Sequence, residues 1–298
     1  MQGMAQQESD RRVADAAPST RDGIEAEPGA RPGAEAGQPW RHVLVTGASS
    51  GIGRALALAC AGPGVTLHLG GRDAGRLAGT AAACAAAGAA ARPQMVDVRD
   101  REAMAAWIAG AGRLDLVIAN AGISAGTGGA TEPADQSRAI FETNLGGVLN
   151  TALPAIEAMA AQAPGPDGLR GRVAVIASIA AFIAVPGAPA YCASKAAVQR
   201  WAEALDATER RRGIRLHAVC PGYIRTPMTA ANSFPMPMLM EPEEAARRAL
   251  RGIAAGRTRI AFPFPVYLAA RIGGALPPGL RAALFAAAPA KGVMPRVG

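Results

Sequence analysis

From residue 41 to residue 220, short apolar runs alternate with longer stretches in which apolar positions recur at helical spacing. The short runs are rich in Val, Leu and Ile, as expected for buried strands. Strands are predicted over Arg41–Thr46, Val65–Leu69, Pro93–Val98, Leu114–Ala119, Arg172–Ser178 and Arg215–Cys220. Helices are predicted over Gly51–Ala61, Ala74–Ala87, 102–110, Gln136–Ala161 (with Pro154 inside) and 190–211.

This alternation predicts the fold class. No hairpin signal joins two neighbouring strands, so successive strands are expected to run parallel, with helices as crossovers. The prediction is an α/β, Rossmann-like, doubly wound parallel sheet with helices on both faces. At 298 residues the chain is long enough for one sizeable domain. We place that domain at 40–256 and treat 257–298 as a C-terminal extension.

The first 39 residues differ from the rest. They are rich in Ala, Gly, Pro, Glu, Asp and Gln, have no apolar periodicity, and carry more acidic than basic residues. Such a segment buries too little apolar surface to offset the entropy of ordering it. It is predicted to be a disordered arm; an overextended gene start is the alternative, because patterned sequence begins only at Trp40.

Charge and cysteine content indicate which partners and which cellular location to expect. The net charge of +8 comes mainly from scattered Arg residues, without runs or interleaved aromatics, so no nucleic-acid partner is expected. The four cysteines, Cys60, Cys84, Cys192 and Cys220, have no metal-ligand spacing and lie in apolar stretches. We therefore expect buried thiols and no metal site. Without a signal core or a long apolar run, the chain is expected to be cytoplasmic.

A glycine-rich turn follows the first strand and opens the first helix. Backbone N–H groups and the helix dipole at such a point favour a pyrophosphate, and glycines allow its close approach. Serine hydroxyls add donors. The predicted nucleotide-binding residues of this turn are Gly47, Ser49, Ser50, Gly51, Ile52 and Gly53.

A tyrosine and a lysine four residues apart form the second motif. Tyr191 and Lys195 fall on one face of a predicted helix, one turn apart. A nearby ammonium favours a phenolate and is expected to lower the pKa of Tyr191 toward the range useful for proton transfer. Ser178, at the end of a predicted strand, is placed to hydrogen-bond a substrate oxygen as charge develops on it.

The two motifs together resemble those of the short-chain dehydrogenase/reductase family, over about residues 41 to 230. The resemblance implies a catalytic set of Asn144, Ser178, Tyr191 and Lys195, in which Asn144 helps to hold a water-linked proton relay. It also implies further cofactor contacts, with Lys195 on the nicotinamide ribose. These contacts are Asp97, Val98, Asn120, Ala121, Gly122, Tyr191, Lys195, Pro221, Gly222, Ile224 and Thr226.

The end of the second strand indicates which nicotinamide cofactor binds. By resemblance, the position at which NAD-preferring relatives place an Asp corresponds to Gly71, and Arg72 follows it. A guanidinium matches a phosphate bidentately, which predicts NADP(H), with NAD(H) as the alternative because Asp73 follows.

Two segments remain after the core. Residues 226–240, rich in Met and Pro, match the family's substrate loop and suggest an apolar substrate, with ordinary loop packing as the alternative. The extension, which contains Arg271 and Arg281, is expected to be a cap or a subunit contact, with membrane contact as the other interpretation. By resemblance, a homodimer or homotetramer is expected.

The sequence therefore predicts an oxidoreductase that moves hydride between NADP(H) and a small-molecule carbonyl/alcohol pair. A catalytically silent nucleotide sensor or scaffold with the same fold is the alternative from another class, and the complete catalytic set argues against it. A nucleotide-sugar epimerase or dehydratase is a third reading, although such relatives usually have a longer substrate domain.

Overall fold

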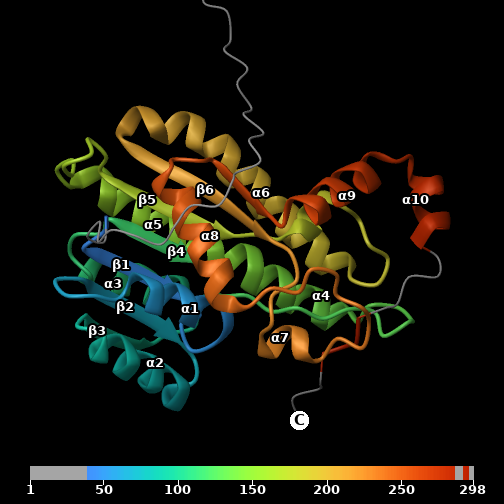
Figure 1. Ribbon diagram of the computed structural model, residues 1–298, viewed down its shortest axis with the longest axis horizontal. Helices are drawn as coiled ribbons and strands as arrows, with labels where there is room; N and C mark the ends of the chain where they lie inside the picture. The colour runs from blue at the N-terminus through green and yellow to red at the C-terminus, as the bar shows by residue number, and fades with distance from the viewer. Residues whose placement is uncertain (1–38, 286–290, 295–298) are drawn as a thin grey trace, which may run out of the picture. The chain divides into compact units, whose positions relative to one another are not determined.

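The computed structural model describes residues 39–285 and 291–294, so the predicted arm lies outside the described residues except for Pro39. Seven strands form one sheet in the order β3-β2-β1-β4-β5-β6-β7, and every pair is parallel (Figure 1). The strands are β1 (His42–Thr46), β2 (Thr66–Gly71), β3 (Ala90–Met95), β4 (Leu116–Ala119), β5 (Gly171–Ile176), β6 (Ile214–Pro221) and β7 (Arg259–Phe262). The Rossmann-like prediction is confirmed.

Helices cover both faces of the sheet (Figure 1). They are α1 (Gly51–Cys60), α2 (Ala74–Ala86), α3 (Arg101–Gly110), α4 (Ala134–Phe141), α5 (Gly147–Ala161), α6 (Pro189–Glu209), α7 (Pro227–Ala230), α8 (Pro242–Ala254), α9 (Phe264–Ala275) and α10 (Pro278–Phe285). Local signals explain where some begin. Asp73 and Asp100 accept hydrogen bonds from the first turns of α2 and α3, each at 2.9 Å, and Pro189 opens α6.

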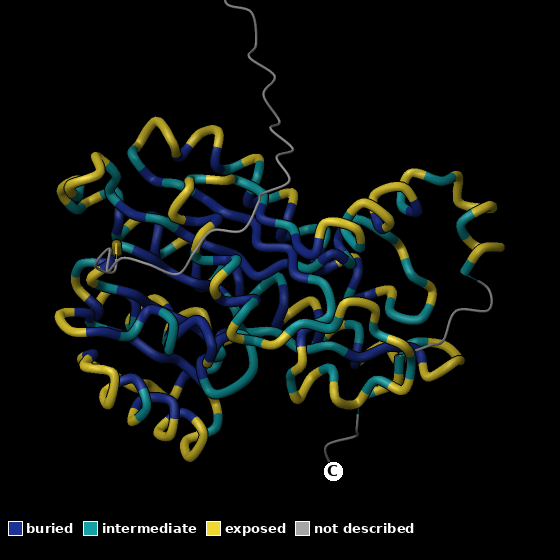
Figure 2. Tube along the Cα trace, viewed as in Figure 1, coloured by how far each residue is buried: buried dark blue, intermediate teal, exposed yellow. Residues whose placement is uncertain are grey.

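The core lies in two layers, one on each side of the sheet. Along β1, Val43 and Val45 join the cluster beneath α1, α2 and α8, whereas Leu44 joins the cluster beneath α3 and α5. This is the period-two alternation of a strand that is buried on both faces. Figure 2 shows the strands buried and the outer sides of the helices exposed. All four cysteines are buried, as predicted.

Two predicted elements are corrected by the structure. The third strand runs from Ala90 to Met95 and not from Pro93 to Val98, because it pairs residue for residue with Thr66–Gly71 of β2 and that ladder ends at Met95. The predicted helix Gln136–Ala161 is divided by a π-helical turn, η1 (Glu142–Gly146), which shifts the helical register between α4 and α5. π-turns of this kind concentrate at functional sites.

One strand lies beyond the predicted set. β7 adds to the sheet edge beside β6, with Ala218–Pro221 paired to Arg259–Phe262. It has only four residues, of which Ile260 and Phe262 are buried. It forms part of the segment that the sequence assigns to a C-terminal extension, so the sheet continues past the predicted domain limit at residue 256.

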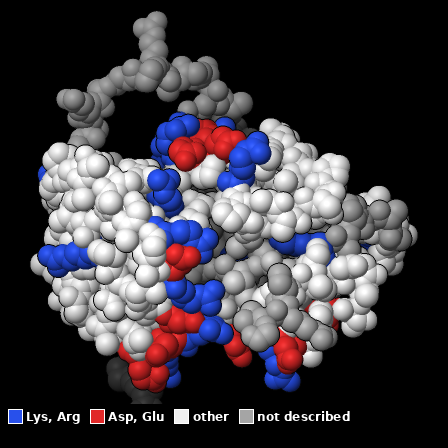
Figure 3. All heavy atoms as spheres, turned by 90° about the horizontal axis from the view of Figure 1, so that it is seen from below, with Lys and Arg blue, Asp and Glu red and all other residues white. Residues whose placement is uncertain are grey.

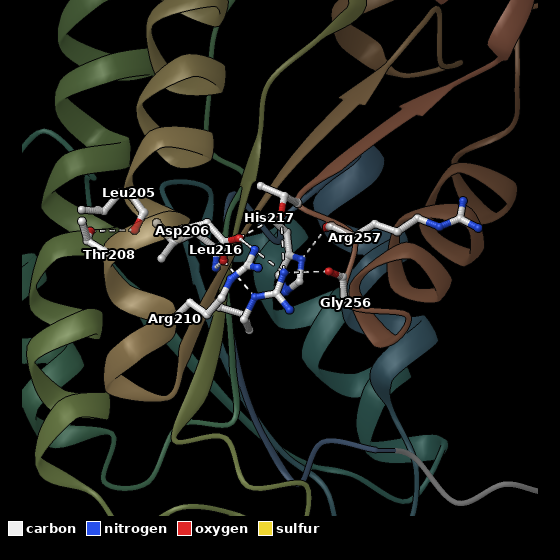
Figure 4. A network of polar contacts seen from close by, with 10 residues as sticks. Leu205, Asp206, Thr208, Arg210, Leu216, His217, Gly256 and Arg257 are labelled. Carbon is white, nitrogen blue, oxygen red and sulfur yellow. Dashed lines mark hydrogen bonds and ion pairs between the residues drawn. The ribbon is translucent and has the colours of Figure 1, made fainter. Parts of the chain in front are cut away.

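A buried carboxylate fastens the end of α6 to β6 and to the turn before β7 (Figure 4). Asp206 has 1% of its surface exposed and accepts hydrogen bonds from Arg215, Arg210, Thr258 and the Leu216 backbone. Burial alone would raise the pKa of this carboxyl, but the two guanidinium groups and the other donors hold the pKa well below its usual range. Asp206 therefore stays ionised and anchors the helix that carries Tyr191.

Helix α9 packs against the turn that follows β5. In the 3-10 turn η2 (Ile179–Phe182), Phe182 meets Tyr267 of α9 edge to face, with ring centroids 5.0 Å apart. Exposed apolar side chains remain along α9 and α10, namely Phe264, Leu268, Ile272, Leu280 and Leu284. Among the described residues, every helix is too short or too polar to cross a membrane.

Candidate active site

A cavity of about 580 Å³ lies at the carboxyl ends of the strands, where the order of the sheet reverses beside β1. This is the position at which open parallel sheets bind ligands. The structure brings nearly all predicted site residues to its wall: Gly47, Ser49, Ser50, Gly51, Ile52, Arg72, Asp97, Val98, Asn120, Ala121, Gly122, Ser178, Tyr191, Lys195, Pro221, Gly222, Ile224 and Thr226. Gly53 and Asn144 lie behind the wall.

The turn between β1 and α1 requires its glycines for reasons of space. Gly47 adopts a φ of +64° and Gly51 a φ of +53°. A Cβ on Gly53 would collide with the carbonyl oxygen of Gly47 and with Asn120 Nδ2. Asn120 in turn donates to the Thr46 carbonyl at 2.9 Å, which ties the end of β4 to the end of β1. The turn and the strand end thus form one tightly packed unit.

The chemistry of this turn fits a pyrophosphate. The first residues of α1 line the cavity, and the side chain of the N-cap residue Ser50 does not cap the helix, so the first backbone N–H groups keep their capacity to donate. Ser49 and Ser50 stand beside them. A dinucleotide cofactor would therefore find donors and a favourable dipole at this end of the cavity.

Two arginines line the opposite end, at the tip of β2. Arg72 forms an ion pair with Asp97 at 3.6 Å, and its side chain is 58% exposed. Arg76, in the first turn of α2, also lines the cavity and was not among the predicted residues. The sequence gives a weak signal for it, because Arg76 follows Arg72 by four positions. A guanidinium pair at this place can receive a phosphate.

Asp97 lies in a loop beyond β3 and does not end that strand, since β3 stops at Met95. Hydrogen bonds from Arg99 lower the pKa of Asp97 to about 2, so its carboxylate is ionised and shared between Arg99 and Arg72. Arg72 itself remains largely exposed at the cavity wall.

Tyr191, in the first turn of α6, is held in the cavity next to Ser178. Burial raises the pKa of Tyr191 to about 12, and the Ser178 side chain acts in the opposite direction. The predicted lowering of this pKa by Lys195 does not appear, because burial dominates and the lowering influence comes from Ser178 and not from Lys195. The phenol is therefore protonated at neutral pH and can donate a proton.

Lys195 lies one helical turn beyond Tyr191, as the four-residue spacing predicts. Its Nζ is 5.9 Å from the centroid of the Tyr191 ring and donates to the Ile176 carbonyl at 2.7 Å. Burial lowers the pKa of Lys195 to about 8, which leaves the side chain largely charged at neutral pH. The carbonyl at the end of β5 fixes the direction of this ammonium.

Asn144 lies in the π-helical turn and is completely buried. Its Nδ2 donates to the Ile123 carbonyl at 3.0 Å and to Ser194 Oγ at 3.1 Å, and its Oδ1 accepts from the Ile123 backbone at 2.8 Å. The side chain thus holds the loop after β4 against α6. This makes Asn144 a positioning residue in the structure described, one step behind the cavity wall.

Ser178 is two residues past the end of β5, at the start of η2. Its Oγ accepts a hydrogen bond from the Ala180 backbone at 3.1 Å, which fixes the hydroxyl oxygen and leaves its hydrogen free to donate. Besides Arg76, the cavity wall includes Ile123 and Thr143, which the sequence did not single out, and Met228, which belongs to the predicted substrate loop 226–240.

Charged side chains gather along the middle of one face of the molecule. Figure 3 shows Lys and Arg interleaved there with Asp and Glu, and not as a continuous basic surface. Exposed ion pairs of the chain include Arg225 with Glu241 at 2.7 Å and Arg247 with Glu244 at 2.6 Å. Many of the individual arginines are thus paired with carboxylates.

Known proteins are similar to this chain in sequence and in architecture. The model of the short chain dehydrogenase family matches residues 41–235. An uncharacterized oxidoreductase of Myxococcus xanthus is 35% identical over 242 residues, which are 80% of this chain and 93% of the relative.

Two solved structures are similar over most of their length. A short-chain dehydrogenase from Sphingobium yanoikuyae, in complex with NADPH, has a TM-score of 0.68 and 27% identity, covering 82% of this chain and 94% of the other. A short chain dehydrogenase/reductase from Burkholderia phymatum, in complex with NAD, has a TM-score of 0.67 and 25% identity, covering 77% and 91%. Similar folds thus accommodate either nicotinamide cofactor.

Proposed function

This chain belongs to the short-chain dehydrogenase family, and from that premise we propose that it transfers hydride between NADP(H) and the carbonyl/alcohol pair of a small molecule. One observation carries the proposal. Ser178, Tyr191 and Lys195 line the same cavity as the glycine turn of α1. Proton-transfer groups and a pyrophosphate site therefore open into one space, as a nicotinamide-dependent reaction requires.

The reaction needs a proton as well as a hydride, and a bound nicotinamide supplies the hydride. In the direction of reduction, Tyr191 Oη donates its proton to the substrate oxygen. Ser178 Oγ donates a hydrogen bond to the same oxygen and stabilises the charge that develops there. Lys195, fixed by the Ile176 carbonyl, stabilises the phenolate that Tyr191 becomes. Asn144 keeps the Ile123 backbone in place beside them.

We propose NADP(H) as the preferred cofactor because Arg72 and Arg76 stand at the tip of β2, where a 2′-phosphate would lie. Both have acidic neighbours, Asp97 and Asp73, at 3.6 Å and 2.8 Å. Both ion pairs lie at the surface, since the two arginine side chains are each 58% exposed. Each arginine can therefore exchange its carboxylate for another anion. A phosphate would exchange these exposed ion pairs for charge-assisted hydrogen bonds.

The experiment is a panel of ketones, aldehydes and alcohols, assayed by NADPH and NADH absorbance. We expect turnover of carbonyl compounds, with kcat/KM at least about tenfold higher for NADPH than for NADH. In Arg72→Ser this ratio should fall by about tenfold. Preference for NADH in the wild type would overturn the cofactor proposal, and absence of turnover across the whole panel would overturn the proposed reaction.

A further inference from the structure

The C-terminal segment 291–294 returns to the loop that follows β4. The backbone N–H groups of Gly126 and Gly128 donate to the carbonyls of Gly292 and Lys291, both at 2.8 Å. Gln136 of α4, which is buried, accepts from the Met294 backbone at 2.7 Å and donates to the Gly126 carbonyl at 2.9 Å. One side chain thus binds the loop and the segment together.

Glycines in this loop leave room for the segment. A Cβ on Gly126 would lie 2.6 Å from both Cβ and the carbonyl oxygen of Lys291. Gly128 has a φ of +61°, and a Cβ on this residue would lie 3.3 Å from Val293 Cγ1. The loop therefore fits this part of the chain closely, and the segment places Lys291 at a defined position.

That position is beside the proton-transfer residue. Lys291 Nζ donates to Ser124 Oγ at 2.6 Å and lies 5.6 Å from the centroid of the Tyr191 ring. Lys195 lies 5.9 Å from the same ring. The two lysines of the chain thus meet at one tyrosine, although Lys291 and Ser124 are 167 positions apart. Ser124 is two residues from Gly122, which lines the cavity.

Within residues 39–285 and 291–294, no carboxylate forms an ion pair with Lys291. Glu132, the acid that contacts both α4 and the first residues of α6, uses its oxygens elsewhere. It accepts from Ala190 N at 3.0 Å, from Ser137 Oγ at 3.1 Å and from Gln136 Nε2 at 3.2 Å. Burial lowers the pKa of Lys291 to about 8. A partly buried ammonium without a counter-charge is costly, and an anion beside it removes that cost.

We propose that Lys291 binds a carboxylate of the substrate, so that this enzyme acts on carbonyl compounds that carry a carboxylate a few bonds from the reacting carbonyl. The inference rests on the proposed function for the carbonyl itself. The backbone hydrogen bonds already anchor the segment, so the Nζ atom is not required for that purpose. An ammonium has three donors, of which Ser124 takes one, and the remaining two suit the oxygens of a carboxylate.

The test compares acids with their uncharged esters. Pyruvate, acetoacetate and levulinate are assayed against their methyl esters in the wild type, in Lys291→Met and in Lys291→Arg. We expect at least one acid to exceed its ester in kcat/KM by about tenfold in the wild type, and this ratio to fall by about tenfold in Lys291→Met. Lys291→Arg keeps a cation at this position and should retain most of the wild-type acid-to-ester ratio. Arg251→Met, an exposed cation of α8, serves as the control for loss of one charge and should keep the wild-type ratio.

A binding measurement distinguishes failure of this inference from failure of the proposed reaction, because it does not require turnover. The three acids are titrated calorimetrically into the wild type and into Lys291→Met. A tenfold loss of affinity in the variant supports the inference even if no carbonyl is turned over. Equal affinities, or no binding of any acid to the wild type, overturn it, as does an acid-to-ester ratio that Lys291→Met leaves unchanged in an active enzyme.

Discussion

Replacing Asp206 by Ala should destabilise the fold strongly without touching the cavity. The carboxylate accepts from Arg215 at 2.9 Å, from the Leu216 backbone at 2.9 Å and from Thr258 at 2.8 Å. After substitution, Arg210 can turn into water because its side chain is 56% exposed, but Arg215 is only 17% exposed and loses its counter-charge. Breaking one partner of a buried ion pair costs about 3–5 kcal/mol.

The lower end of that range applies here, because Arg215 keeps the Gly256 carbonyl as an acceptor at 2.7 Å. We therefore expect a loss of about 3 kcal/mol, which for a chain of this size lowers Tm by roughly 6–12 °C. The assay is thermal unfolding followed by circular dichroism. Asp100→Ala, which removes only the exposed cap of α3, should cost about 1 kcal/mol and provides the matched control.

The pH dependence of this loss gives a second check. The pKa of Asp206 is depressed in the folded protein, so its stabilising contribution is complete above the unfolded value of about 4 and declines as pH falls below it. The difference in Tm between wild type and Asp206→Ala should thus be full at pH 7 and smaller at pH 3. A fall in Tm of less than about 2 °C at pH 7 would refute the reasoning.

Two further predictions concern the cavity. Gly53→Ala places a Cβ against the Gly47 carbonyl and Asn120, so NADPH affinity measured by fluorescence should fall by more than about tenfold. The control is Gly79→Ala, in open space on α2, which should leave that affinity unchanged. Equal NADPH affinities of the two variants would contradict the packing argument. The kcat/KM for carbonyl reduction should fall above about pH 8, as Lys195 loses its proton, and Lys195→Arg should move that fall to higher pH. A profile that is identical in both proteins would count against a role for the Lys195 charge.

The sheet and most of the cavity could be predicted from the sequence because their signals are local. β1 has three consecutive apolar residues, Val43 to Val45, and the glycine turn adjoins it directly. Tyr191 and Lys195 are close in sequence and therefore close in space. Predictions of this kind need no knowledge of distant contacts.

Other features depend on contacts between segments that are distant in sequence. β7 has four residues, too few for a distinct period, and exists because β6 offers it an edge. The π-helical turn around Asn144 has no recognisable composition. The burial that raises the pKa of Tyr191 also comes from the assembled fold. Lys291 reaches the site only because Gly126 and Gly128 receive the C-terminal segment.

The most direct test of the account is Tyr191→Phe, with Tyr267→Phe of α9 as the matched control. Carbonyl reduction is measured in single turnovers with saturating NADPH, alongside NADPH binding by fluorescence. The account predicts that Tyr191→Phe still binds NADPH but loses activity by about a thousandfold, because no other group donates the proton at that atom. Turnover in Tyr191→Phe close to that of Tyr267→Phe would contradict the central claim.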